Sequence, residues 1–121
     1  MKRFIPSFGA ALLYAVSPAS AADFEGEWQM ADVPAASARL SIGPGSLSWS
    51  DGCNSFSKGY MRSGEAFTFM PTMGTQMICE PKPRDYVGEA VEKIHLLRRD
   101  GEDILIVDAG ESVVGRFKPV K

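Results

Sequence analysis

Residues 94–118 read IHLLRRDGEDILIVDAGESVVGRFK, and this stretch decides the fold class. Two short turn segments that each contain glycine, at residues 100–102 and 109–111, divide it into three mostly apolar runs. An Asp-Gly pair between apolar runs is among the stronger sequence signals for a β-hairpin. We therefore predict a three-stranded antiparallel meander, with strands at residues 94–99, 103–108 and 112–118.

The stretch before the meander predicts a single short helix. Its apolar residues recur at i, i+3, i+4 and i+7, which places them on one face of an α-helix; they are Val87, Ala90, Val91 and Ile94. Gly88 weakens a helix by roughly 1 kcal/mol relative to alanine, so we expect a short helix that ends near Lys93 and is held by packing. The central run of the meander, residues 104–107, is apolar at every position and suits a strand that this helix covers.

The first half of the chain predicts a strand followed by two hairpins. Polar and apolar residues alternate on both sides of Gly43-Pro44-Gly45, and the pattern repeats around residues 62–65. Residues 71–79 follow neither the helical nor the strand period, so we expect an ordered loop there. The predicted strands cover residues 24–30, 39–42, 46–50, 56–61 and 66–70. The expected fold is therefore mainly β, in the α+β sense, with one covering helix.

The amino terminus has the layout of a secretory signal peptide. A basic start at Lys2 and Arg3 precedes an apolar run over residues 4–16, and residues 17–21 supply the small side chains that signal peptidase accepts. The apolar run is shorter than the ~20 residues that a membrane-spanning helix needs. We expect residues 1–21 to be removed after Ala21, leaving one domain at 22–121 that is periplasmic or secreted and has no membrane span.

The balance of charge argues against nucleic acid as a partner. The chain has 13 basic and 15 acidic residues, for a formal net charge of −2 at pH 7. Loss of Lys2 and Arg3 with the leader would make the remaining chain more acidic, and an acidic surface repels a phosphate backbone. The single histidine and the lack of clustered ligands in the sequence predict no metal site and no cofactor.

Cys53 and Cys79 are the only two cysteines. In an exported chain an even pair indicates a disulfide, which would stabilise a domain of this size. Two alternatives stay open: a pair of reduced thiols, or a catalytic thiol that uses His95 as its base.

The candidates for catalysis are weak. A Cys53–His95 dyad needs the imidazole within hydrogen-bonding distance of the thiol, whereas His95 lies in a run that predicts a strand. Glu25 and Glu27 share a strand face, but hydrolytic chemistry needs two carboxyl groups that face each other across a site. We expect both glutamates to be solvated and the protein not to be an enzyme.

Three motifs carry a resemblance to a known family. They are Gly26-Glu27-Trp28, then Gly52-Cys53-Asn54 followed by aromatics at 56 and 60, and Thr75-Gln76-Met77-Ile78-Cys79. On these residues the chain resembles the META-domain (HslJ-like) family. The matching motif positions are Gly26, Trp28, Gly52, Cys53, Asn54, Tyr60, Thr75, Met77 and Cys79. Two positions depart from the family pattern: Lys58 stands where a glycine is common, and Gln76 where a basic residue is common.

The resemblance implies a fold and a setting rather than a reaction. It implies an antiparallel sheet curled into a partial barrel with one helix across it, a location in the bacterial envelope, and links to heat stress, drug stress or secretion. It implies no catalytic activity. Within that fold we expect Trp28 to pack in the core against Tyr60 or Phe67, and the Asn54 side chain to bond nearby backbone groups.

Two functional hypotheses follow. In the first, a monomeric, non-enzymatic envelope protein binds an unknown protein or a small apolar ligand and contributes to stress or drug tolerance. In the alternative, the protein inhibits an enzyme that attacks the envelope, such as a lysozyme or a protease, with residues 71–80 as the inhibitory loop.

Overall fold

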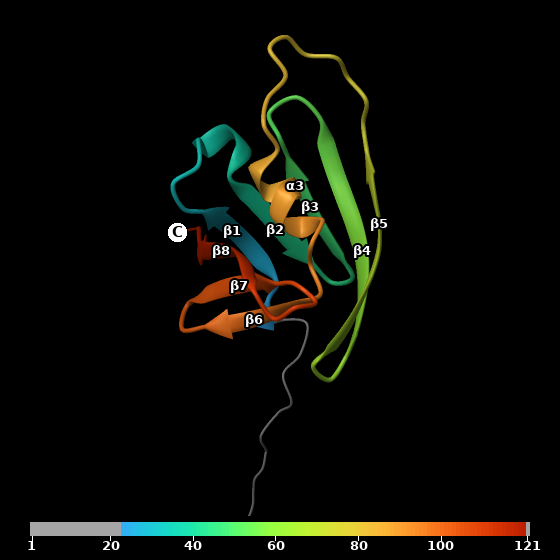
Figure 1. Cartoon of the computed structure of the whole chain (residues 1–121), viewed down its shortest axis with the longest axis vertical. Helices are drawn as coiled ribbons and strands as arrows, with labels where there is room; N and C mark the ends of the chain where they lie inside the picture. Colours follow the sequence, from blue (N-terminus) through green and yellow to red (C-terminus); the bar gives the residue numbers. More distant parts are fainter. Residues whose placement is uncertain (1–22, 121) are drawn as a thin grey trace, which may run out of the picture.

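An eight-stranded antiparallel sheet forms the body of the molecule, and one short helix packs against it (Figure 1). The computed structural model describes residues 23–120, so the predicted leader at residues 1–21 lies outside the described residues. The strands are β1 Gly26–Met30, β2 Arg39–Gly43, β3 Ser46–Ser50, β4 Ser55–Ser63, β5 Ala66–Gly74, β6 Leu96–Asp100, β7 Asp103–Val107 and β8 Val113–Pro119. A 3-10 turn, η2 (Ala35–Ser37), and the helix α3 (Tyr86–Val91) complete the fold.

The order of the strands across the sheet is β5-β4-β3-β2-β1-β8-β7-β6. The first strand lies between the two halves, because β1 pairs with β2 on one side and with the last strand, β8, on the other. The edge strands β5 and β6 approach each other without a ladder of hydrogen bonds between them. The sheet therefore curls into a partial barrel that is not closed, as the family resemblance implies.

A single hydrophobic cluster joins the concave side of the sheet to α3. The helix contributes Val87, Ala90 and Val91, which are three of the four positions that the helical period predicts to be apolar and on one face. The largest fully buried side chains are Phe117, Leu40, Leu47, Ile104, Ile106, Val87, Val91 and Val107. Both hairpins and the meander thus supply one core.

The carboxylate of Asp85 fixes the start of α3 and ties it to the sheet. One carboxylate oxygen accepts a hydrogen bond from the backbone N–H of Gly88 at 2.9 Å, which is a helix N-cap. The other accepts one from the indole Nε1 of Trp49 on β3 at 3.2 Å. A Cβ at Gly88 would lie 1.9 Å from the Asp85 Oδ2, so a larger residue at position 88 would displace the carboxylate that caps the helix.

A loop was predicted over residues 71–79. This prediction is wrong for the first four residues, which extend β5 to Gly74. The register passes from Lys58 opposite Thr72 to Tyr60 opposite Phe69, so β5 carries one extra residue in a bulge. Pro71 lies in this irregular stretch of an edge strand, where the missing N–H of proline is tolerated.

Some boundaries also differ from the sequence expectation. The helix ends at Val91 rather than near Lys93, because the N–H groups of Lys93 and Ile94 bond carbonyls three residues back, in the tighter 3-10 manner. Ile94 then belongs to neither the helix nor β6 and packs against the core between them.

Trp28 is buried in the core, at 4% exposure, and its Nε1 donates a hydrogen bond to the carbonyl of Phe24 at 2.8 Å. Tyr60 belongs to the same cluster, and its hydroxyl donates to the carbonyl of Gly43 at 2.9 Å. The ring of Phe67 meets Phe24 edge-on, with centroids 5.9 Å apart. Phe24, which precedes β1, therefore contacts Trp28 through its backbone carbonyl and Phe67 through its ring.

Candidate partner-binding loop

The site begins with a tight turn after β3 that is built on Asp51. This buried carboxylate accepts hydrogen bonds from the N–H groups of Cys53, at 2.8 Å, and Asn54, at 2.7 Å. The backbone closes the turn with a bond from the Asp51 N–H to the Asn54 carbonyl at 3.1 Å. Gly52 has a φ of +95°, a conformation that other residues rarely adopt. The turn therefore fixes the directions of the Cys53 and Asn54 side chains.

The side chain of Asn54 clamps the loop that follows β5. Its Oδ1 accepts hydrogen bonds from the Met77 N–H at 2.6 Å and the Thr75 hydroxyl at 2.7 Å, and its Nδ2 donates to the Met77 carbonyl at 3.1 Å. Thr75 also pairs with the backbone of Ser55 through both its N–H and its hydroxyl oxygen. The Gly-Cys-Asn and Thr-x-Met-x-Cys motifs thus meet in one hydrogen-bonded unit.

The cysteines add a second brace two residues further on. The sulfur atoms of Cys53 and Cys79 lie within disulfide-bonding distance, and their Cα atoms are 6.3 Å apart. The pair is compatible with an oxidising compartment. Position 78 is therefore held on both sides, by the Asn54 clamp at Met77 and by the pairing at Cys79.

Between these braces the loop presents apolar side chains to solvent. Ile78 is 93% exposed and Met77 63%, and Met73 at the end of β5 is 72% exposed. We call Met77 and Ile78 the loop tip. In Figure 1 the segment that carries the tip arches away from the sheet beyond the ends of β3, β4 and β5. The tip is therefore an exposed apolar surface whose backbone is held by the Asn54 hydrogen bonds and the cysteine pair.

The segment that returns from the tip to α3 is polar and is anchored by an ion pair. Two of the three guanidinium nitrogens of Arg84, Nε and Nη2, donate to the carboxylate of Glu89 at 2.8 Å, and the guanidinium lies 4.5 Å from the centroid of the Tyr86 ring. The hydrogen bonds raise the pKa of Arg84 and lower the pKa of Glu89. A hollow of about 580 Å³ lies between this pair and the Asn54 clamp.

Of the residues considered for catalysis, only Cys53 belongs to this loop site. His95 is exposed in the connection between α3 and β6, where its N–H bonds the Val107 carbonyl at 2.8 Å, while the sulfur of Cys53 is directed toward Cys79. Glu25 and Glu27 are exposed, and Glu27 accepts a hydrogen bond from the Ser41 hydroxyl. Within residues 23–120, no group of three or more His, Cys, Asp or Glu side chains could hold a metal ion.

Two residues that build the site, Asp51 and Asp85, were not among the residues expected from the sequence to have a role. Both had a recognisable signal. Asp51 precedes a glycine at the end of a strand, which is typical of a turn. Asp85 stands directly before the apolar helical period, the usual position of an N-cap. Each is central because its carboxylate satisfies two separate donors.

Comparison with known proteins supplies a family. The family described as META domain matches residues 20–120. Neither the curated proteins nor the solved structures gave a significant match. No helix in the described part of the chain is long and apolar enough to cross a membrane.

Proposed function

Because the chain belongs to the META-domain family, we propose that it is a non-enzymatic protein of the bacterial envelope whose loop tip binds a partner protein. The observation that carries this proposal is the Ile78 side chain, which is almost fully exposed although its backbone is braced on both sides. An apolar side chain that is already ordered can enter a pocket on a partner with little further loss of entropy.

The chemistry of the tip favours a protein with an apolar pocket. Met77 and Ile78 would form the buried centre of the contact, where binding energy concentrates. Glu80, Lys82 and Arg84 follow on the return segment and would form a polar rim with charges of both signs. An apolar centre with a polar rim is the usual anatomy of a protein interface.

The setting we propose is the oxidising side of the inner membrane, with a contribution to tolerance of envelope stress or drugs. The cysteine pair supports this, since disulfides persist in the periplasm and are rare in the cytosol. Deletion of the gene would then raise sensitivity to heat or to drugs that act on the envelope, and a copy carrying Ile78→Ser would restore tolerance less well than the wild type.

Affinity capture tests the binding proposal directly. Residues 22–121 would be immobilised and exposed to periplasmic extract, beside the Ile78→Ser variant and the control Met61→Ser, which alters an exposed methionine on β4. We expect a partner that the wild type and Met61→Ser retain and Ile78→Ser loses. If all three proteins recovered the same partner in equal amounts, the loop tip would not be the binding surface.

The same geometry supports a second candidate, an inhibitor of an envelope-attacking enzyme. A rigid loop that projects one apolar side chain is suited to occupy the cleft of a lysozyme or a protease. The inhibitor candidate predicts that micromolar wild-type protein slows one of these enzymes and that Ile78→Ser relieves the inhibition. If the enzymes keep full activity, this candidate fails and the first one stands.

A further inference from the structure

The gap between the two edge strands contains a half-open pocket of about 290 Å³. Its apolar floor is formed by Phe24, Phe67 and Leu97, of which Phe24 and Leu97 are core residues. It lies between the turn that joins β4 to β5 and the strand β6, at the opposite end of the molecule from the loop tip (Figure 1). Its volume is close to the lower limit for small-molecule sites.

Three arginines line this pocket. The guanidinium of Arg62 lies over two rings of the floor, 4.9 Å from the centroid of Phe24 and 5.1 Å from that of Phe67. Arg99 is held by two carbonyl oxygens, those of Asp23 at 2.6 Å and Gly101 at 3.1 Å. Arg98 is exposed and also lines the pocket. Guanidinium groups bind carboxylates and phosphates with two parallel hydrogen bonds.

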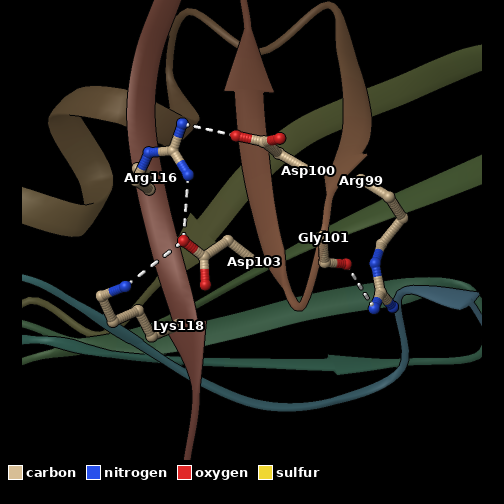
Figure 2. A network of polar contacts seen from close by, with 6 residues as sticks. All are labelled: Arg99, Asp100, Gly101, Asp103, Arg116 and Lys118. Atoms are coloured by element: carbon tan, nitrogen blue, oxygen red, sulfur yellow. Dashed lines mark hydrogen bonds and ion pairs between the residues drawn. The ribbon is translucent and has the colours of Figure 1, made fainter.

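The two aspartates of the hairpin between β6 and β7, Asp100 and Asp103, bond to residues of β8. Figure 2 shows Arg116 of β8 donating to Asp100 and Asp103, at 2.7 and 2.9 Å, with Lys118 3.4 Å from Asp103, while Arg99 points away toward the Gly101 carbonyl. Asp23 and Glu65 are the acidic residues that line the pocket, so its lining has three basic and two acidic residues. The pocket is apolar inside and carries an excess of positive charge.

We propose that this pocket binds a small amphiphilic anion. The apolar body of the ligand lies against Leu97 and the parts of the Phe24 and Phe67 rings that the Arg62 guanidinium leaves uncovered, and its carboxylate or phosphate head faces Arg98 and Arg99. A neutral molecule would bury the same apolar surface without using the arginines, and a cation would be repelled by them. The site is separate from the loop tip and is tested independently of the proposed partner.

Octanoate is a suitable probe because it combines a short apolar chain with one carboxylate. Its binding to isotope-labelled residues 22–121 would be followed by chemical-shift changes, beside octanol and octyltrimethylammonium as the neutral and cationic analogues. We expect shifts centred on Phe24, Phe67 and Leu97, and an affinity for octanoate about tenfold above that for octanol. Equal affinities for the three probes, or shifts that map away from the pocket, would overturn the proposal.

A charge reversal tests the contribution of the ligand's head group separately from that of the apolar floor. Arg98→Glu alters an exposed side chain and should leave the fold intact. We expect it to weaken octanoate binding about tenfold and to leave octanol binding unchanged. The matched control, Arg39→Glu, reverses an exposed arginine on β2 that does not line the pocket and should leave both affinities as in the wild type. Unchanged octanoate binding by Arg98→Glu would refute the role of the arginines.

Discussion

At the scale of single residues, the motif positions act on the backbone. Asn54 makes three hydrogen bonds to the segment that carries Thr75 and Met77, and Asp51 makes two to the turn that carries Asn54. Side-chain amides and carboxylates can replace backbone partners where a ladder ends. The Asn54 side chain was expected to bond nearby backbone groups, whereas the backbone groups that it contacts belong to Met77, 23 positions further along the chain.

Asn54→Ala tests the clamp. The substitution removes three hydrogen bonds and leaves the N–H and carbonyl of Met77 without that partner, so we expect the free energy of unfolding to fall by ~1–3 kcal/mol. Urea unfolding of the oxidised protein measures the change. Gln76→Ala, at an exposed position in the same loop, serves as the control and should change stability by less than ~0.5 kcal/mol.

Gly88→Ala gives a test in which two effects oppose each other. Helix propensity alone predicts a gain of roughly 1 kcal/mol for alanine. The close approach of Asp85 predicts a loss, because the new Cβ would displace the carboxylate that caps the helix, and a lost cap costs ~1 kcal/mol or more. We expect a net loss by thermal unfolding, whereas Gly43→Ala, where a Cβ meets no atom within 4 Å, should be neutral. A stabilised Gly88→Ala variant would contradict the tight cap.

At the scale of elements, the strand period predicted which segments form strands, and tertiary contacts decided where they end. The β5 extension was missed because Pro71 interrupts the alternation, yet a bulge on an edge strand accommodates it. The helix is shorter than its apolar period because its last N–H groups take closer partners. Neither the extension of β5 nor the early end of the helix can be predicted from local sequence, because each depends on contacts with a neighbouring strand or turn.

Removal of the bond between Cys53 and Cys79 should destabilise the domain but leave the hydrogen bonds of Asn54 in place. Closing a loop between Cys53 and Cys79 contributes about 3.5 kcal/mol in the chain-entropy model. We expect the double variant Cys53→Ser/Cys79→Ser to lose a comparable amount in urea unfolding. Titration of thiols in protein isolated from the periplasm provides the independent check, since two reactive thiols would show that the pair is reduced there.

Arg116 and Lys118 of β8 form a network of ion pairs with Asp100 and Asp103. This network should make the free energy of unfolding depend on pH in the acid range. Hydrogen bonds from Arg116 and Lys118 lower the pKa of Asp103 below its ordinary value of 3.8. A carboxyl group whose pKa is lower in the folded state adds stability above its unfolded pKa, and that stability is lost as the pH falls through the folded value.

The measurement is the loss of stability between pH 6 and the region below pH 4. Arg116→Gln removes the main donor to Asp103, so we expect this variant to lose less stability on acidification than the wild type does. Arg39→Gln is the control and should follow the wild-type profile. An unchanged acid profile for Arg116→Gln would show that the network, which is exposed, contributes no net stabilisation.

At the scale of the whole molecule, the partial barrel separates two surfaces with different chemistry. One end carries the loop tip, and the other carries the arginine-lined pocket in the gap between β5 and β6 (Figure 1). The pocket exists because the sheet curls until its edges meet without pairing. An antiparallel sheet that closed fully would have no such gap.

Export of the whole chain can be tested by mass spectrometry. We expect protein recovered from the periplasm to begin at Ala22 and to run as a monomer in analytical ultracentrifugation. Protein that keeps Met1, or that stays in the cytosol, would contradict the proposed setting, because the oxidised cysteine pair depends on reaching an oxidising compartment.

The sequence alone determined the mainly β class, the single helix, the buried helix face and the family motifs. These follow from local periodicity and turn chemistry, which act over a few residues. Only the tertiary structure decided that Asn54 clamps Met77, that Phe24 packs against Phe67, and that the edge strands enclose a pocket lined by arginines. Such contacts join segments far apart in the chain, and their geometry depends on how the whole sheet twists and curls.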